Sequence, residues 1–144
     1  MFDSLEIIKE KSHKDASLKL NELITQFIEK NKKFNMGLSG GNTPKFFYQT
    51  FAELNQENSD ITLWTIDDRH VHLEDEISNQ GMINSIFNKT KMNILELQFN
   101  EDPNKSAEDY SRLVFSKIQS FDSAVLGAVS YTHLTLPTTC AVWV

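Results

Sequence analysis

Residues 38–46, Leu-Ser-Gly-Gly-Asn-Thr-Pro-Lys-Phe, decide the fold around them, because they lead from an apolar stretch directly into a helix signal. The apolar run at 34–38 predicts a strand, and Thr43 suits the N-cap of the helix, with the following proline at its first position. Gly40 and Gly41 permit positive φ angles and leave main-chain N–H groups uncovered. Together with the positive end of the helix dipole, these N–H groups favour an anionic ligand such as a phosphate. The alternative is a tight turn whose glycines serve geometry alone.

The rest of the chain alternates between strand-like and helical patterns of apolar residues. Further strands are predicted at 61–66, 93–97 and 124–126, and helical segments at 20–28, from Pro44, from Ser78 and from a capping-box-like start at 106–109. Alternation of this kind favours an α/β fold. We expect a three-layer, Rossmann-like domain in which helices cover both faces of a parallel sheet.

A second polar cluster follows the predicted strand at 61–66, within Trp64-Thr-Ile-Asp-Asp-Arg-His-Val-His72. Open α/β sheets bind ligands beyond the carboxyl ends of their strands, which makes Asp67 and Arg69 candidates for a ligand site. Arg69 offers a planar fork of donors that suits a phosphate. An ion pair with Asp67 or Asp68 is the alternative, and it is compatible with phosphate binding.

Two histidines in the same stretch raise the question of a metal. His70 and His72 lie two residues apart, so on an extended segment both would face one side, close to Asp67 or Asp68. No convincing third ligand accompanies them, and we interpret both as partly exposed loop histidines and expect no metal. His13, among lysines and acids, is interpreted as a solvated residue.

The composition is typical of a soluble globular domain, with 144 residues of which 40% are hydrophobic and 24% charged. A net charge of −6 argues against a general nucleic-acid binder and means that an anion site must concentrate positive groups such as Lys45 locally. The sequence contains neither a membrane-spanning run nor a signal-peptide pattern. The single Cys140 fits a reducing compartment, so we expect a cytoplasmic protein.

Three motifs, in this order and spacing, resemble the 6-phosphogluconolactonase family, part of a wider group that holds the glucosamine-6-phosphate isomerases and deaminases. They are Ser-Gly-Gly-x-Thr-Pro at 39–44, Asp-acid-Arg-x-Val at 67–71, and Ser-Asn at 78–79 opening a helix. The resemblance runs from about Ser4 to Gly127.

The second and third motifs separate the branches of that group. The deaminase branch typically reads Asp-Glu-Tyr at the second motif, so Arg69 and the Ser-Asn pair favour the lactonase branch. Two positions depart from the family pattern, which usually has glutamate where Asp68 stands and proline where His72 stands.

The resemblance implies hydrolysis of 6-phospho-D-glucono-1,5-lactone to 6-phosphogluconate in the pentose phosphate pathway, with no metal or organic cofactor. The expected partner is this phosphorylated lactone, with no nucleic acid and no membrane. Two alternatives stay open: an aminosugar-phosphate isomerase or deaminase of the same fold, and a non-catalytic phosphosugar-binding fragment. The residues that the resemblance assigns to substrate and phosphate binding are Ser39, Gly40, Gly41, Asn42, Thr43, Lys45, Asp67, Arg69, Ser78 and Asn79.

After Gly127 the composition changes abruptly, because residues 128–144 contain no Asp, Glu, Lys or Arg. In the family a Gly-x-Asp-Gly-His loop follows at this point and supplies the expected general base, whereas this chain has only His133 at about the right position. We therefore expect residues 1–127 to be the N-terminal part of one lactonase- or isomerase-like domain, incomplete at the C-terminus. Residues 128–144 are expected to be a foreign or frameshifted tail, with a genuine divergent terminus as the alternative. Such a chain is expected to be catalytically inactive and poorly stable.

Overall fold

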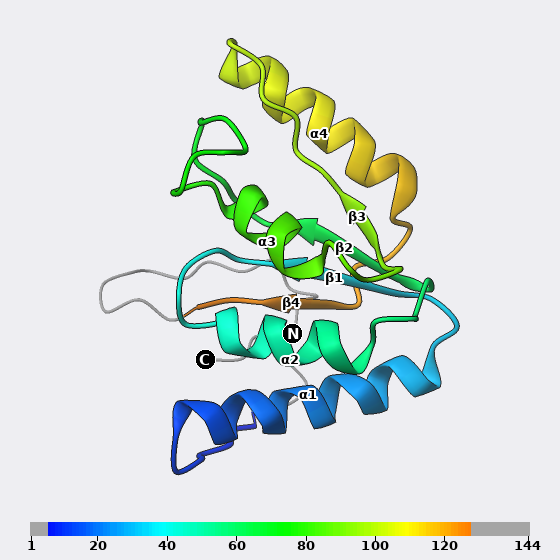
Figure 1. Cartoon of the computed structure of the whole chain (residues 1–144). Helices are drawn as coiled ribbons and strands as arrows, with labels where there is room; N and C mark the ends of the chain where they lie inside the picture. Colours follow the sequence, from blue (N-terminus) through cyan, green and yellow to red (C-terminus); the bar gives the residue numbers. More distant parts are fainter. Residues whose placement is uncertain (1–5, 128–144) are drawn as a thin grey trace.

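Helices and strands alternate along residues 6–127, the part of the chain that the computed structural model describes (Figure 1). In chain order the elements are α1 (His13–Lys30), β1 (Phe34–Leu38), α2 (Lys45–Leu54), β2 (Ile61–Thr65), α3 (Asn79–Phe87), β3 (Asn93–Leu95), α4 (Pro103–Lys117) and β4 (Ser123–Val125). None of the helices in this part of the chain combines the length and apolar content that crossing a bilayer requires. The expectations for residues 128–144, including those for His133 and Cys140, lie outside the described residues.

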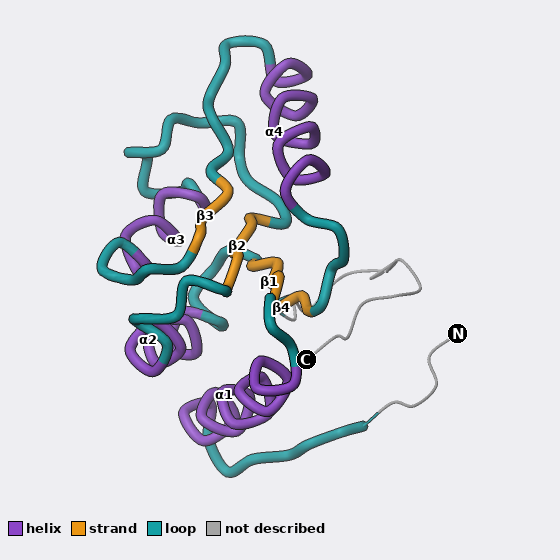
Figure 2. Tube along the Cα trace, turned by 90° about the vertical axis from the view of Figure 1, so that its right-hand side faces the viewer, coloured by secondary structure: helices purple, strands orange, loops and turns teal. Residues whose placement is uncertain are grey.

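The four strands form one parallel sheet in the order β3-β2-β1-β4. The chain builds outward from β1 through β2 to β3 and then returns to place β4 on the other side of β1. Figure 2 shows α1, α2 and α3 on one side of the row of strands and α4 on the other. The predicted α/β class, with helices on both faces of a parallel sheet, is confirmed. The strand order reverses between β1 and β4, and a reversal of this kind is where doubly wound sheets bind their ligands.

The main core lies between the sheet and the helices α1, α2 and α3. Aromatic rings of α2 and α3 form much of it, with ring centroids 5.5 Å apart for Phe47 and Phe51 and 6.5 Å apart for Phe51 and Phe87. The large hydrophobic side chains that are fully buried in the described residues are Ile24, Phe34, Met36, Leu38, Phe47, Tyr48, Phe51, Ile61, Leu63, Ile83 and Phe87. This core holds β1 and β2 rigidly, and the loops that follow these strands begin from fixed positions.

A smaller cluster covers the other face, where Leu95, Val114 and Ile118 are buried between the sheet and α4. Tyr110 of α4 completes the hydrogen bonding of β2 at the point where β3 has ended. Its hydroxyl accepts a hydrogen bond from the Thr65 N–H at 2.7 Å and donates one to the Thr65 carbonyl at 3.1 Å. Burial raises the pKa of the Tyr110 hydroxyl to about 12, so the group stays a neutral donor at physiological pH.

The start of α4 corrects a prediction made from the sequence. The helix begins at Pro103, ahead of the expected start at Ser106, and the Asp102 carboxylate caps it by accepting the Asn104 N–H at 2.9 Å. An aspartate N-cap followed by proline at the first position is a stronger helix start than the Ser-x-x-Asp pattern. Ser106 is buried inside the helix instead, where its hydroxyl donates to the Gln98 carbonyl at 3.1 Å.

Candidate functional site

The three sequence motifs meet at the carboxyl edge of the sheet. The loops after β1 and β2 and the first turns of α2 and α3 gather on the same side of the molecule, at the left in Figure 1. The loop after β1 stands beside the end of β4, because Gly127 N–H donates to Ser39 Oγ at 3.2 Å. The glycine loop therefore lies at the reversal of strand order, where a ligand is expected.

The glycine loop is anchored at its first residue and open at its tip. Ser39 donates its N–H to the Val125 carbonyl at 3.1 Å, and its own carbonyl accepts a 2.8 Å hydrogen bond from the Tyr48 hydroxyl. Burial raises the pKa of Tyr48 well above its usual value, which keeps this hydroxyl protonated. Gly41 has φ +94°, and a Cβ added to it would meet no atom within 4 Å. The tip therefore combines a left-handed backbone with free space beside it.

The start of α2 corrects a second prediction. Pro44 occupies the N-cap position with no side-chain hydrogen bond, so the prediction of Thr43 as the N-cap is wrong. The Asn42 carbonyl accepts the Lys45 N–H at 3.3 Å, and this turn makes the helix begin one residue later. The Lys45 N–H is engaged in this turn, but no side chain caps the helix, so the N–H groups that follow Lys45 in the first turn are left for another partner, which suits an anion.

His13 contacts the end of the glycine loop, an arrangement that sequence reasoning missed. Its side chain is exposed, as expected of a solvated residue, but Nε2 lies 2.6 Å from the Thr43 carbonyl. The first turn of α1 is thus tied to the last residues of the glycine loop. No local pattern could reveal this contact, because the two residues are 30 positions apart.

The start of α3 is capped, unlike that of α2. Ser78 is its N-cap, as predicted, and Ser78 Oγ accepts the Gly81 N–H at 2.9 Å. The Asp68 carboxylate accepts the N–H groups of Asn79 and Gln80, at 2.6 and 2.9 Å. An anion is already present at this helix end, so a phosphate has no place there. Of the two helix starts at this edge, only that of α2 is open.

Arg69 points to neutral partners rather than to its acidic neighbours. Its Nη1 donates to Asn79 Oδ1 and, at 3.4 Å, to the Ile77 carbonyl. Within residues 6–127 the guanidinium forms no ion pair with Asp67 or Asp68, so the ion-pair alternative is wrong. The physical reason is that the Asp68 carboxylate already accepts the first N–H groups of α3. Arg69 thus keeps a full positive charge at the edge of the site.

Asn79 connects the three motifs. It is 4% exposed, and its Nδ2 donates to the Asp67 carbonyl at 2.8 Å while its Oδ1 accepts from Arg69. A Cβ placed on Gly40 would lie 1.8 Å from Asn79 Oδ1, so the carboxamide rests directly on the glycine backbone. Gly40 is needed for this close approach, whereas Gly41 is needed for its φ angle.

The remaining predicted residues lie on the surface around the loop. Asn42, Thr43, Lys45 and Asp67 are all exposed. Lys45, in the first turn of α2, adds a second positive charge to the side of the loop that faces solvent. The structure therefore brings the predicted polar residues to one edge of the sheet, some as scaffold and others accessible to a ligand.

A buried glutamine next to the Ser-Asn pair was missed by sequence reasoning. Gln80 is fully buried, and its Oε1 accepts hydrogen bonds from Thr65 Oγ1 at 2.7 Å and from the Leu97 N–H at 3.0 Å. Its Nε2 donates to Asn84 Oδ1 at 2.9 Å. The side chain thus locks α3 to the ends of β2 and β3. Its position beside the motif was the only signal in the sequence.

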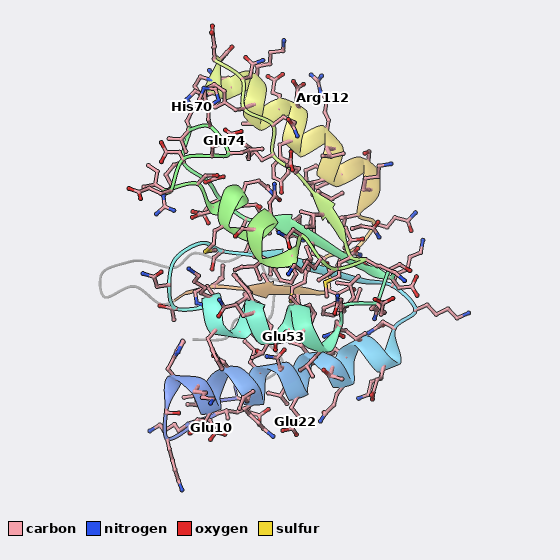
Figure 3. All side chains as sticks on the ribbon, in the orientation of Figure 1. Glu10, Glu22, Glu53, His70, Glu74 and Arg112 are labelled. Atoms are coloured by element: carbon pink, nitrogen blue, oxygen red, sulfur yellow. The ribbon has the colours of Figure 1, made fainter. Side chains whose placement is uncertain are left out.

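His70 and His72 both contact Phe99, with ring centroids 4.8 and 4.0 Å apart. His70 and Glu74 lie on the loop between β2 and α3, as Figure 3 shows, and both histidines are exposed. His70 Nε2 also lies 2.7 Å from the Asn100 carbonyl. In the described part of the chain, no three His, Cys, Asp or Glu side chains converge on one point.

Comparisons with known proteins place the chain among proteins that act on sugar phosphates. Residues 9–134 match the family described as glucosamine-6-phosphate isomerases/6-phosphogluconolactonase. The 6-phosphogluconolactonase of Thermotoga maritima is 29% identical over 113 residues, which are 76% of this chain and 51% of that protein.

Solved structures show the same likeness. The crystal structure of 6-phosphogluconolactonase from Thermotoga maritima superimposes with a TM-score of 0.73 at 25% identity, covering 83% of this chain and 57% of that one. A monomeric glucosamine-6-phosphate deaminase shares the fold, with a TM-score of 0.70 at 17% identity over 84% of this chain and 54% of that one. The chain spans 35% to 55% of the length of the curated relatives that it matches.

Proposed function

The chain belongs to the glucosamine-6-phosphate isomerase/6-phosphogluconolactonase family, and on this premise we propose that it carries the substrate site of a 6-phosphogluconolactonase. The substrate is 6-phospho-D-glucono-1,5-lactone. Water adds to the lactone carbonyl carbon, the ring C–O bond breaks, and 6-phosphogluconate leaves with release of a proton. The observation that carries the proposal is the open start of α2 beside an arginine that forms no ion pair with a carboxylate among residues 6–127.

The phosphate of the substrate is held by two kinds of positive group. The uncapped first turn of α2 offers main-chain N–H groups and the positive end of the helix dipole. Arg69 offers a planar fork of donors whose present partners are an amide and a carbonyl oxygen, and these leave its charge free. Lys45 adds charge without fixed geometry. In a chain of net charge −6, these positive groups at one edge of the sheet favour an anionic substrate.

The chemical step needs two further groups at the lactone carbonyl, a base for the water and donors for the developing oxyanion. The N–H group at Gly41 supports the second role, because a Cβ placed on this residue would meet no atom within 4 Å. The base that the family resemblance implies comes from the Gly-x-Asp-Gly-His loop, whose only counterpart is His133, outside the described residues. The described residues therefore support binding of the substrate, whereas the base expected for the chemical step lies outside them. We further propose the pentose phosphate pathway as the setting and the cytoplasm as the location, the latter supported by the single cysteine.

Binding and hydrolysis are tested separately on the 144-residue chain. Isothermal titration with 6-phosphogluconate tests the site, and glucose 6-sulfate tests whether the phosphate is required. Saturable binding of 6-phosphogluconate is expected, and a chain that is folded but does not bind it would contradict the proposal. Hydrolysis is followed as loss of the lactone relative to a protein-free blank, because the lactone also opens spontaneously. Hydrolysis above that blank that is lost in His133→Ala would show that the expectation of an inactive chain is wrong.

A matched substrate separates the two enzyme activities of this family. Glucosamine 6-phosphate is offered to the same preparation, and release of ammonium is measured. No release is expected, because Arg69 and the Ser-Asn pair favour the lactonase branch. Ammonium release without lactone hydrolysis would assign the chain to the deaminase branch instead.

A further inference from the structure

We infer that Asn79 is a positioning residue: it aims the Arg69 guanidinium at the anion site without neutralising its charge. The inference rests on the proposed function, because it assigns to Asn79 a part in holding the phosphate. It differs from the sequence-based expectation that Asn79 contacts the substrate itself. Both polar atoms of the carboxamide are already engaged by the protein.

The hydrogen bonds of Asn79 allow only one orientation of its carboxamide. The Asp67 carbonyl can only accept a hydrogen bond, so the group that faces it at 2.8 Å must be the amide nitrogen. The Arg69 guanidinium can only donate, so the group that faces it must be the amide oxygen. A flipped carboxamide would lose both contacts inside a residue that is 4% exposed. The side chain therefore presents a fixed acceptor to Arg69.

The same carboxamide is braced against the anion loop. Asn79 Oδ1 and Cγ lie at 1.8 and 2.0 Å from the position that a Cβ on Gly40 would occupy. The backbone N–H of Asn79 is held in addition by the Asp68 carboxylate at 2.6 Å. The acceptor that orients Arg69 thus rests on the glycine loop and on the start of α3 together, which places the guanidinium relative to both.

A neutral acceptor matters because an anion is to be bound by the same guanidinium. A carboxylate at this position would form an ion pair with Arg69 and compete with the phosphate for its donors. The Asp68 carboxylate, next to Arg69 in the chain, accepts hydrogen bonds from the main-chain N–H groups of Arg69, Asn79 and Gln80 and from Ser78 Oγ, the last at 3.2 Å. The site therefore keeps one carboxylate occupied and uses an amide to orient the arginine. The chemical class of ligand that this arrangement takes is a phosphomonoester.

The first test uses an almost isosteric change. Asn79→Asp keeps the shape of the side chain and places a negative charge against Arg69, whereas Asn88→Asp makes the same charge change at the exposed far end of α3. Binding of 6-phosphogluconate is measured by calorimetry on the 144-residue chain, with circular dichroism to confirm folding. Asn79→Asp is expected to weaken binding about tenfold or more, and Asn88→Asp less than about twofold. Equal affinities of the Asn79→Asp variant and the unchanged protein would overturn the inference.

A double-mutant cycle separates positioning from direct contact. Asn79→Ala is made in the unchanged protein and in an Arg69→Ala background, and the two losses of affinity are compared. If Asn79 acts through Arg69, its removal weakens binding only while Arg69 is present. The same loss in both backgrounds would assign Asn79 to direct ligand contact and overturn the inference. A folded, unchanged protein that fails to bind 6-phosphogluconate would instead contradict the proposed function, and the inference with it.

Discussion

Two adjacent glycines in the same loop are required for different reasons. Gly41 has φ +94° in open space, so a side chain there costs backbone strain of about 1–2 kcal/mol and covers the N–H groups of the loop. We expect Gly41→Val to abolish binding of 6-phosphogluconate while the protein stays folded, as measured by calorimetry and circular dichroism. Gly40→Ala is expected to displace Asn79 and weaken binding through Arg69. Unchanged affinity in Gly41→Val would remove the anion site from this loop.

The charge of Arg69 is not sufficient without its geometry. Arg69→Lys keeps the charge but loses the planar fork, so binding of 6-phosphogluconate should weaken by roughly 1.5–3 kcal/mol, the range for hydrogen bonds to charged groups. Arg112→Lys is the matched control, because Arg112 is exposed on α4 and pairs with Glu108 and Asp109 (Figure 3). Both variants should unfold at the same denaturant concentration as the unchanged protein. Loss of stability with retained affinity would give Arg69 a structural role.

Tyr110 makes the stability of the fold sensitive to alkaline pH. Burial raises its pKa from 10.0 to about 12, so between these values the folded state keeps a proton that the unfolded state has lost. The stabilisation of the folded state by protonated Tyr110 is complete below pH 10 and is lost as the pH rises through about 12. Tyr110→Phe should lower the free energy of unfolding at neutral pH by about 1–3 kcal/mol, because Thr65 loses its partner. Between pH 10 and 12, the free energy of unfolding should fall less in this variant than in the unchanged protein, as measured by urea unfolding at each pH. The same fall in both proteins would contradict the role assigned to Tyr110.

The two helices at the edge of the site begin in opposite ways, and this difference decides their roles. The start of α3 is capped by Ser78 and Asp68, whereas α2 begins without a side-chain cap. Ser78→Ala should lower the free energy of unfolding by about 1 kcal/mol, the usual effect of losing an N-cap. Asp68→Ala should cost more, because it removes the charged carboxylate that accepts the N–H groups of both Asn79 and Gln80. Urea unfolding measures both, and stability unchanged in both variants would show that α3 does not depend on its caps.

Across the whole molecule, stability is distributed unevenly between the two faces of the sheet. The face under α1, α2 and α3 carries the large aromatic core, and the face under α4 carries a small cluster. Regions with few buried apolar contacts open first in native proteins. Native-state hydrogen exchange should therefore show the slowest amides in β1 and β2 and faster exchange in α4. Exchange in α4 as slow as in β1 would mean that both faces unfold as one unit.

The sequence by itself determined the order and type of the elements, because apolar periodicity and the residues at helix starts act between neighbours. The α/β class, the strand before the glycine loop and the Ser78 cap of α3 were predicted on that basis and are confirmed. The predicted starts of α2 and α4 were wrong by one to a few residues, since competing local caps are hard to rank from sequence alone.

Only the tertiary structure decided how the site is assembled. Arg69 and Asn79 are 10 positions apart, His13 and Thr43 are 30 apart, and Thr65 and Tyr110 are 45 apart, so no local pattern pairs them. Whether Arg69 meets a carboxylate or an amide depends on which N–H groups already occupy Asp68, and that depends on where α3 packs against the sheet. The sequence shows which side chains are available, because each residue's chemical groups do not depend on the fold. The partners of these side chains depend on the tertiary structure, in which the chain crosses over to place β1 between β2 and β4.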